Sequence, residues 1–578
     1  MRHYISIVFI CILTLISLNA QGYPQLITFT ENRSLESALL SDIKQYENKN
    51  NVIFAHKIMI DTDILAERDT VELQLDGENI AVFKIYSTDN IEMDYLYNTY
   101  ESENAHVYIS KLGNNIQGII HSSSGFYTID TYGDSYILEK INMDDVPEDA
   151  EPLLQENIFT TSLSREVNST DTAHLRILVM YTPEALPYAS NMINKVYLEI
   201  NNGNTSFNNS DIKAKFEIAY VGQTEDSESG FTFSQLLSKY RINGDGLFDE
   251  VHTLRNRYSA DICVLLVKNY EYCGKGYVGA SANTAFAVVN VYSACSNKFS
   301  FTHEIGHNVG CTHDTIASPS TSYNHGYQHY IEGDNANSWR TMMAYDTLCF
   351  TGCRRIPYWS NPNINYNGFP TGTITRCDNA RVWNENAIGV SHFRPDSVNI
   401  RITNTDNSSY MDYAHWRALQ TIVVDSGYAV NSGQIVKLSA ANSITLRPST
   451  KINAGAKFLA TNVVDDNPTL SYPQFLSRQH GSAQHEFDTQ QEKSNVFVSP
   501  NPAFSNVNIT LNLKEDMQSV SISILDISGQ LQQKVVQAEI LQRGSVSYPV
   551  DVSSYANGMF FVVVEINDMM YVNKIIKQ

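Results

Sequence analysis

The sequence predicts a multidomain chain with a central α/β domain, a β-rich segment before it and all-β modules after it. The 578 residues suffice for three or four domains, and a hydrophobic content of 43% supports sizeable cores. Strand-like and helix-like runs alternate between residues 173 and 395, which is typical of a sheet covered by helices. Short strand-like runs separated by Gly, Asn and Asp fill the regions on either side.

The first 20 residues have the pattern of a secretory signal peptide. Arg2 and His3 precede an apolar run over residues 5–18, and Leu18-Asn19-Ala20 offers a small residue before a cut. The alternative is an N-terminal membrane anchor, for which the run is short. No later stretch has eighteen uninterrupted apolar residues, so we expect no transmembrane segment in the mature chain.

Residues 21–170 contain no cysteine and carry strand-like runs such as residues 80–86 and 118–121. Residues 143–169 are acidic and then rich in Ser and Thr, like an accessible linker. Because this region lies between the signal and the central domain, we interpret it as a prosegment.

The central domain is expected at residues 171–395. Predicted strands cover residues 175–181, 216–221, 261–267 and 286–291. Predicted helices cover residues 186–201, 233–240, 247–258 and 378–393, with one further helix around residue 305.

That further helix carries the pattern HExxHxxGxxH, formed by His303, Glu304, His307, Gly310 and His313. Two histidines four apart lie on one helix face, so both imidazoles can reach one zinc ion. Gly310 can end the helix in the left-handed conformation and return His313 as a third ligand. Three protein ligands leave a fourth position for water, which indicates one catalytic Zn²⁺ with Glu304 as general base.

The alternative for a bare HExxH is a solvated helix with two surface histidines, and the added glycine and third histidine make it much less favourable. No motif supports a calcium ion. The net charge of −22 and the lack of a basic block argue against a nucleic-acid partner.

Seven cysteines follow the signal, all in the central domain: Cys263, Cys273, Cys295, Cys311, Cys349, Cys353 and Cys377. Cys263 lies in an apolar run and is predicted to be a buried free thiol. The other six could form three disulfides in 15 ways. A four-cysteine zinc site is the competing interpretation, but the spacing lacks paired CxxC motifs.

Short, evenly spaced strands over residues 396–464 suggest stacked rungs, either a spacer or, less favoured, a carbohydrate- or matrix-binding module. Residues 465–494 are polar and mixed, as in a linker. Residues 495–578 alternate apolar and polar residues, which predicts a small β-sandwich.

The zinc motif followed by Thr341-Met342-Met343-Ala344-Tyr345 resembles the metzincin zinc endopeptidases. By that resemblance Met343 is the methionine beneath the zinc ligands, and Tyr345 is the tyrosine beside the zinc. Asp314 matches the aspartate that follows the third histidine in the reprolysin branch. Over residues 175–394 the chain is most similar to bacterial peptidyl-Asp metalloendopeptidase-type enzymes.

The C-terminal segment resembles the sorting domain of Bacteroidetes type IX secretion, through Pro500-Asn501-Pro502, DISG, NGMFFV and the closing NKIIK. An adhesion domain is the alternative. The resemblance implies secretion machinery as a partner and a secreted or cell-surface location.

Together these features predict a secreted zinc endopeptidase acting on extracellular proteins or peptides. The strand at residues 286–291 is expected to receive substrate as an extra antiparallel strand. Arg340, Arg354 and Arg355 are candidates for binding an acidic substrate residue, although surface or salt-bridged arginines are an equal alternative.

Cleavage before Asp would permit self-processing at Thr170–Asp171. Without a prosegment cysteine, latency would need another group or simple obstruction. The alternative function is a surface adhesin with a structural zinc.

Overall fold

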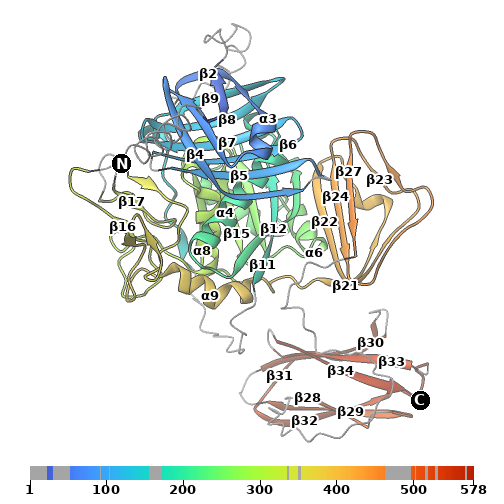
Figure 1. Cartoon of the computed structure of the whole chain (residues 1–578). Helices are drawn as coiled ribbons and strands as arrows, with labels where there is room; N and C mark the ends of the chain where they lie inside the picture. Colours follow the sequence, from blue (N-terminus) through green and yellow to red (C-terminus); the bar gives the residue numbers. More distant parts are fainter. Residues whose placement is uncertain are drawn as a thin grey trace, which may run out of the picture. The chain divides into compact units, whose positions relative to one another are not determined.

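The computed structural model describes residues 23–29, 52–90, 93–102, 104–154, 172–189, 191–334, 337–348, 353–462, 496–500, 503–513, 518–526, 531–556, 558–566 and 569–577 (Figure 1). The expected signal peptide, the linker at 465–494, Cys349 and the Thr170–Asp171 bond lie outside these ranges. The chain divides into two compact units, Met1–Gln474 and Phe475–Gln578. Among the described helices, none has both the length and the apolar character needed to cross a bilayer.

Nine strands at the N-terminal end close into a β-barrel, in the order β1-β2-β9-β8-β7-β6-β5-β4-β3. Every second residue of a strand points into the barrel and fills its core. On β3 these residues are Val71, Leu73 and Leu75. The elements are β1 (Gln25–Phe29), β2 (Val52–Ile60), α3 (Thr62–Glu67), β3 (Thr70–Leu75), β4 (Glu78–Asn90), β5 (Tyr95–Glu101), β6 (Ala105–Leu112), β7 (Asn115–Ser122), β8 (Gly125–Tyr132) and β9 (Ser135–Ile141).

The central domain is built on a mixed sheet in which β10, β14, β15, β13, β11 and β12 are neighbours in that order. β15, β13, β11 and β12 run parallel, and every residue of β13 is buried, as expected for a strand covered on both faces. The strands are β10 (Leu153–Leu154), β11 (Ala173–Tyr181), β12 (Ala214–Gln223), β13 (Ile262–Val267), β14 (Gly274–Val278) and β15 (Phe286–Asn290).

Helices cover this sheet, and α4 lies between it and the barrel (Figure 1). Polar side chains of α4 bind the barrel: Tyr97 donates to Asn202 at 3.0 Å, and Ser110 donates to Asn194 at 2.6 Å. The helices are α4 (Met192–Asn209), α5 (Phe233–Arg241), α6 (Glu250–Arg257), α7 (Ser293–Asn297), α8 (Ser300–Val309) and α9 (Asn379–Val390). α4 begins at Met192 rather than at residue 186, because the Asn191 side chain caps it by accepting from the Asn194 amide.

Short strands join the loops between α8 and α9. β16 (Gln328–His329), β17 (Trp339–Arg340) and β18 (Arg354–Arg355) form one small sheet. β19 (Asn365–Tyr366) and β20 (Phe369–Pro370) form a hairpin.

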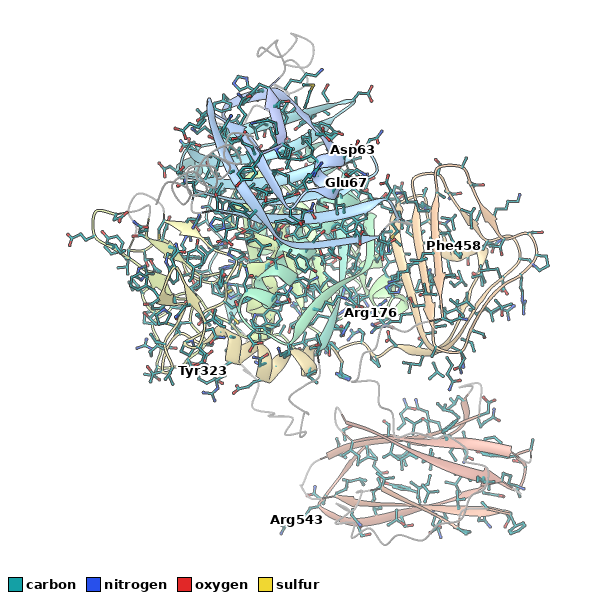
Figure 2. The ribbon with its side chains drawn as sticks, viewed as in Figure 1. Asp63, Glu67, Arg176, Tyr323, Phe458 and Arg543 are labelled. Carbon is teal, nitrogen blue, oxygen red and sulfur yellow. A yellow bond between two sulfur atoms is a disulfide. The ribbon has the colours of Figure 1, made fainter. Side chains whose placement is uncertain are left out.

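Residues 397–461 form parallel rungs that continue the central sheet. Tyr413 pairs with Ile435, and Ile435 pairs with Lys457, so successive rungs are 22 residues apart. β22 also pairs with β12, and buried Arg176 of β11 (Figure 2) donates to the His415 carbonyl at 2.8 Å. The rungs therefore share the central core and are not an isolated module. The strands are β21 (Ser397–Ile402), β22 (Met411–Val424), β23 (Ala429–Val430), β24 (Ile435–Ala440), β25 (Ser443–Leu446), β26 (Lys451–Ile452) and β27 (Lys457–Thr461).

The second unit is a two-layered β structure with its own apolar core, to which Ile509, Ile522 and Val562 belong. One sheet has the order β28-β29-β32 and the other β31-β30-β33-β34. The strands are β28 (Val496–Ser499), β29 (Asn506–Leu513), β30 (Gln518–Asp526), β31 (Leu531–Leu541), β32 (Gly544–Asp551), β33 (Gly558–Ile566) and β34 (Met569–Lys577).

The cysteine pairing differs from the expected three disulfides. Cys273 and Cys295 are joined, with a Cα–Cα distance of 5.4 Å, and Cys353 is also disulfide-bonded. Cys263 is a buried free thiol, as its apolar run predicts. Cys311 and Cys377 are buried free thiols too, so the prediction of three bridges is wrong. Cys311 packs into the main apolar core instead of pairing.

Candidate active site

Helix α8 and the turn after it bring the three predicted histidines together. His303 and His307 lie on α8, and Gly310 caps the helix with a φ of 114°, which favours glycine. The chain then turns back and places His313 against them. All three side chains are fully buried.

The ring nitrogens are arranged as metal ligands. The Nε2 atom of His313 lies 3.2 Å from that of His303 and 3.0 Å from that of His307. The Nδ1 atoms face the other way: His303 is 2.9 Å from the Met342 carbonyl and His307 is 2.8 Å from the Cys311 carbonyl. Nδ1–H donation to a carbonyl leaves the Nε2 lone pair free, which is how metal-binding histidines are held.

The protonation state agrees with this arrangement. Burial, reinforced by the charge of Arg355, lowers the pKa of His303 well below its usual range. Burial and the neighbouring His313 do the same to His307. Three imidazoles whose Nε2 atoms point at one another suit a shared cation, so the residues present fit a bound metal ion.

Glu304 leaves α8 beside this group. Its side chain is fully buried, and both carboxylate oxygens lack a hydrogen-bond partner among the described residues. Burial and the charge of Asp149 raise its pKa well above the usual range. Gly274 of β14 makes room for it, since a Cβ there would lie 2.5 Å from Glu304 Cγ. A carboxylate so placed can accept a proton from a reacting water.

Met343 lies directly beneath the histidine helix. It is fully buried, and a Cβ built on Gly306 of α8 would lie 2.8 Å from its sulfur and 2.7 Å from the Trp359 ring. The glycine therefore allows the turn at Met343 to pack closely under α8. The Met342 carbonyl from this same turn holds His303, so the turn orients a ligand.

Tyr345 and Asp314 link that turn to His313. The Tyr345 ring lies 3.9 Å from the His313 ring, centroid to centroid. Asp314 accepts from the Tyr345 amide at 3.1 Å and from the Ile316 amide at 3.0 Å. His325 also supports this loop, with its Nδ1 2.8 Å from the His313 carbonyl.

A segment far from the motif in sequence lies against the site. Residues 148–154 follow the edge strand β14: Cys273 donates to the Glu148 carbonyl, Ala150 donates to the Gly274 carbonyl, and β10 pairs with β14. Sequence reasoning identified only an acidic linker here. Its acidic composition is the only feature of the sequence that could have pointed to a role at the site, because no local pattern predicts the pairing of residues 148–154 with β14.

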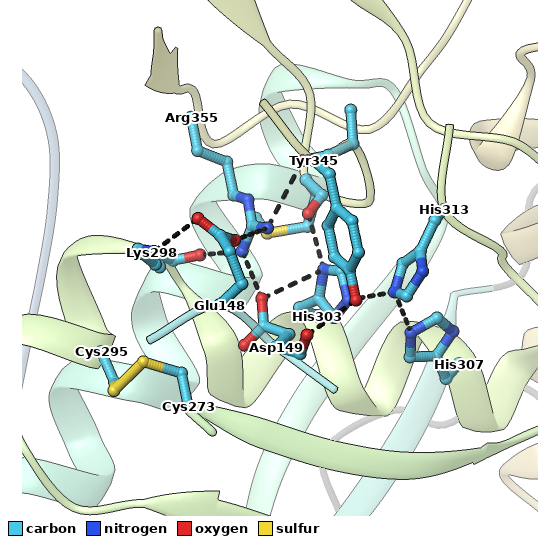
Figure 3. A network of polar contacts seen from close by, with 12 residues as sticks. Glu148, Asp149, Cys273, Cys295, Lys298, His303, His307, His313, Tyr345 and Arg355 are labelled. Carbon is cyan, nitrogen blue, oxygen red and sulfur yellow. Dashed lines mark hydrogen bonds and ion pairs between the residues drawn. A yellow bond between two sulfur atoms is a disulfide. The ribbon is translucent and has the colours of Figure 1, made fainter. Parts of the chain in front are cut away.

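This segment places two carboxylates among basic side chains (Figure 3). Asp149 lies 2.8 Å from Arg355, and Glu148 lies 2.5 Å from Lys298. Burial would raise the pKa of Glu148, but the charges of Arg340, Lys298 and Arg355 outweigh it and lower the pKa to about 2. Tyr345 donates to the Asp149 carbonyl at 2.7 Å.

Two expectations about substrate binding change. The strand β15, at residues 286–291, pairs with β13 on one side and β14 on the other, so it cannot accept a further strand. The strand beyond β15 is β14, which would be the edge of the sheet without the docked β10, and its glycine-rich sequence gives little strand signal. Of the three candidate arginines, Arg340 and Arg355 face the acidic segment, whereas Arg354 lies against Tyr366.

Comparisons with known proteins show which families this chain resembles. Residues 171–360 match a model of metallo-peptidase family M12, and residues 497–578 match a secretion system C-terminal sorting domain. A peptidyl-Asp metalloendopeptidase of Stenotrophomonas maltophilia strain R551-3 is 33% identical over 343 residues, 57% of this chain and 81% of the relative. A namesake from Xanthomonas campestris pv. campestris is 40% identical over 235 residues, 40% of this chain and 54% of the relative.

Among solved structures, metalloproteinase-II from Bacteroides fragilis aligns with 62% of this chain and 96% of its own, at 11% identity and a TM-score of 0.31, which is too low to support an argument. The sequence relatives confirm the resemblance to metalloendopeptidases and decide against the adhesin alternative. The sorting domain indicates a secreted or cell-surface protein. The chain therefore belongs to metallo-peptidase family M12 and is a metalloendopeptidase with a C-terminal secretion sorting domain.

Proposed function

We propose that the chain hydrolyses peptide bonds of extracellular proteins, with one zinc ion held by His303, His307 and His313 and with Glu304 as general base. The observation that carries this proposal is the buried Glu304 carboxylate, which has no described partner and lies beside three converging Nε2 atoms. An unpaired buried carboxylate is costly unless its site uses it.

The catalytic roles follow from the side chains present. Zinc, when bound, supplies a Lewis acid that activates water and polarises the scissile carbonyl. Glu304 takes the proton from the attacking water and passes it to the leaving amine. Tyr345 donates a hydrogen bond to the carbonyl oxygen as negative charge develops there. Its phenol already donates to a main-chain carbonyl, that of Asp149.

Met343, Gly310 and Asp314 are supporting residues in this proposal. Met343 fixes the position of His303 through the Met342 carbonyl, and Gly310 turns the chain so that His313 faces α8. Asp314 joins the His313 loop to Tyr345.

Residues 21–170 serve as a prosegment that keeps the enzyme latent by obstruction. This is supported by residues 148–154, which pair along β14. In the chain they lie after the barrel and before residues 171–360, the region that matches the peptidase family. No prosegment cysteine is needed, because the docked backbone itself covers the edge at which a substrate strand would pair. Cleavage in the region 155–171 would release it.

The enzyme prefers an acidic residue at the cleavage site, as the names of its relatives suggest.

Residues 495–578 direct export through the type IX secretion machinery, which the sorting-domain match supports. Residues 171–395 form the metzincin-like catalytic domain, and residues 396–464 act as a spacer attached to it.

Replacing Glu304 tests the mechanism. Glu304→Ala should retain zinc, because all three imidazoles remain, yet lose roughly 10³-fold or more of kcat on casein because the proton acceptor is gone. Zinc content and turnover are measured on one preparation. The exposed Glu332 provides a matched control, since Glu332→Ala removes an identical group from the surface. Wild-type turnover by the zinc-bound Glu304→Ala enzyme would refute the mechanism.

A further inference from the structure

Three basic side chains converge on the carboxylates of Glu148 and Asp149, beside the histidines. Lys298 precedes α8, Arg340 belongs to β17, and Arg355 belongs to β18. Their side chains are 4%, 5% and 1% exposed. Burying three like charges together is unfavourable unless anions neutralise them.

Main-chain carbonyls hold the two guanidinium groups in place. Arg340 donates to the Ala344 carbonyl at 2.9 Å and to the Cys353 carbonyl at 3.2 Å. Arg355 donates to the Lys298 carbonyl at 2.5 Å. Rigid, oriented guanidinium groups are suited to recognising a carboxylate.

The two carboxylates belong to the docked residues 148–154. Asp149 is fully buried, with Oδ2 2.8 Å from Arg355 Nη1 and 3.8 Å from His303 Nδ1. The side chain of Asp149 thus lies next to a histidine of the catalytic group, while its own carbonyl receives the Tyr345 hydroxyl. Glu148, whose side chain is partly exposed, contacts Lys298 and Arg340.

Asp149 therefore places both its backbone and its side chain where those of a substrate residue would lie. Its carbonyl accepts from the proposed oxyanion donor Tyr345, its segment pairs with β14 in the parallel direction, and its carboxylate lies against Arg355 beside His303. When the segment leaves, the three buried cations lose their carboxylate partners. An acidic substrate side chain is the group that restores this neutrality.

We infer that the position beside Lys298, Arg340 and Arg355, which Glu148-Asp149 fills in the latent chain as a tethered substrate mimic, is the subsite for the acidic side chain of the substrate, and that Arg355 determines the specificity. The inference rests on the proposed peptidase function. It assigns recognition of the acidic side chain to Arg355, with Lys298 and Arg340 in support. Arg354 has no part in this recognition, because its side chain lies against the Tyr366 ring.

The test measures kcat/KM for two peptide substrates. The enzyme used is the active form that the full chain yields on secretion. The fluorogenic peptides contain a single Asp or, at the same position, Asn, and mass spectrometry maps the cut. We expect the wild type to favour the Asp peptide by roughly a hundredfold in kcat/KM. Arg355→Met should reduce that ratio to near one by losing Asp turnover, and Arg355→Lys should restore part of it. Arg354→Met is the matched control and should keep the wild-type ratio.

A second measurement does not depend on turnover or on the folding of an Arg355 variant. Calorimetry measures binding of a free peptide with the sequence of residues 146–154 to the processed wild-type enzyme, from which a chelator has removed the zinc so that the peptide is not cut. We expect replacement of the peptide's Asp by Asn to weaken binding by roughly tenfold or more. Equal binding of the two peptides, or an unchanged Asp/Asn ratio in Arg355→Met, would overturn the inference.

The outcomes separate this inference from the peptidase function on which it rests. Zinc-dependent cleavage of both peptides at equal rates refutes the subsite and leaves the peptidase intact. Absence of zinc-dependent cleavage of any peptide refutes the proposed function. A purely structural role for Arg355 would lower both rates together and leave the ratio unchanged, which also counts against the inference.

Discussion

Gly274 sets the space available to the proposed general base. A Cβ at this position would lie 2.5 Å from Glu304 Cγ and Oε1, closer than any real contact. Because β14 is held by pairing with β15, Glu304 would have to move rather than the strand. Glycine is therefore required here for its lack of a side chain, not for an unusual backbone angle.

We predict that Gly274→Ala lowers kcat by roughly 10²-fold, since displacing a catalytic group by about 1 Å has effects of that size. Zinc content should stay unchanged, because no histidine is touched. Gly276→Ala offers a graded comparison: a Cβ there would lie 3.1 Å from the Glu304 carbonyl oxygen, so the loss should be smaller. Equal activity of Gly274→Ala and the wild type would show that Glu304 does not need its present position.

Cys311 shows how one residue can serve two purposes. Its thiol is buried in the apolar core, and burial raises its pKa well above the usual range, so it stays a neutral packing group. Its carbonyl meanwhile accepts from His307 Nδ1 at 2.8 Å. The catalytic contribution at this position therefore comes from the main chain and does not require a cysteine.

At the scale of elements, the docked segment is held partly by charge. Glu148 contacts Lys298, Arg340 and Arg355, and its pKa falls from 4.5 to about 2. A carboxylate with a lowered folded-state pKa stabilises the fold fully above 4.5, and that contribution is lost as the pH falls from 4.5 toward 2. Its side chain is 32% exposed, so we expect roughly 1–2 kcal/mol after solvent screening is considered.

We predict that Glu148→Gln lowers the Tm of the full chain at pH 6, and that the difference from the wild type shrinks as the pH falls below 4.5. Thermal unfolding of both proteins across pH 6 to 3 measures this. The same gap at every pH would mean that the ionised form of Glu148 contributes nothing.

The zinc helix could be predicted from sequence because its information is local. His303, Glu304 and His307 need only helical spacing, and Gly310 needs only its own backbone freedom. The acidic segment could not be predicted, because Asp149 and Arg355 are far apart in the chain and meet only through the fold. The position of β15 in the sheet was predicted wrongly for a similar reason. The apolar β15 looks more like a strand than Gly274-Lys275-Gly276-Tyr277-Val278, and only the pairing shows that β14 lies between β15 and the docked β10.

At the scale of the whole molecule, the two units have separate cores. The second unit buries Ile509, Ile522 and Val562 in a core of its own. The broad order of the chain was predictable, since composition changes where domains change. The 22-residue rungs were predicted as stacked strands, but their continuity with β12 was not, because Met411–Val424 gives no sequence sign of its partner.

We predict that removing residues 495–578 leaves folding and peptidase turnover unchanged but abolishes export. Each unit with its own core should fold alone. Purified shortened and full-length proteins are compared for Tm and for turnover of casein, and culture supernatants are compared by immunoblot. A shortened chain that is still exported would remove the sorting role, and one that fails to fold would show that the units depend on each other.

The central claim is that turnover depends on zinc held by three histidines, and a metal titration tests it most directly. The secreted enzyme is stripped with a chelator, and Zn²⁺ is returned in steps while bound metal and casein turnover are measured together. We predict that turnover rises in proportion to bound zinc and saturates at about one ion per chain, and that His313→Ala binds zinc more weakly and stays inactive. Full turnover by enzyme that contains no bound metal would contradict the account.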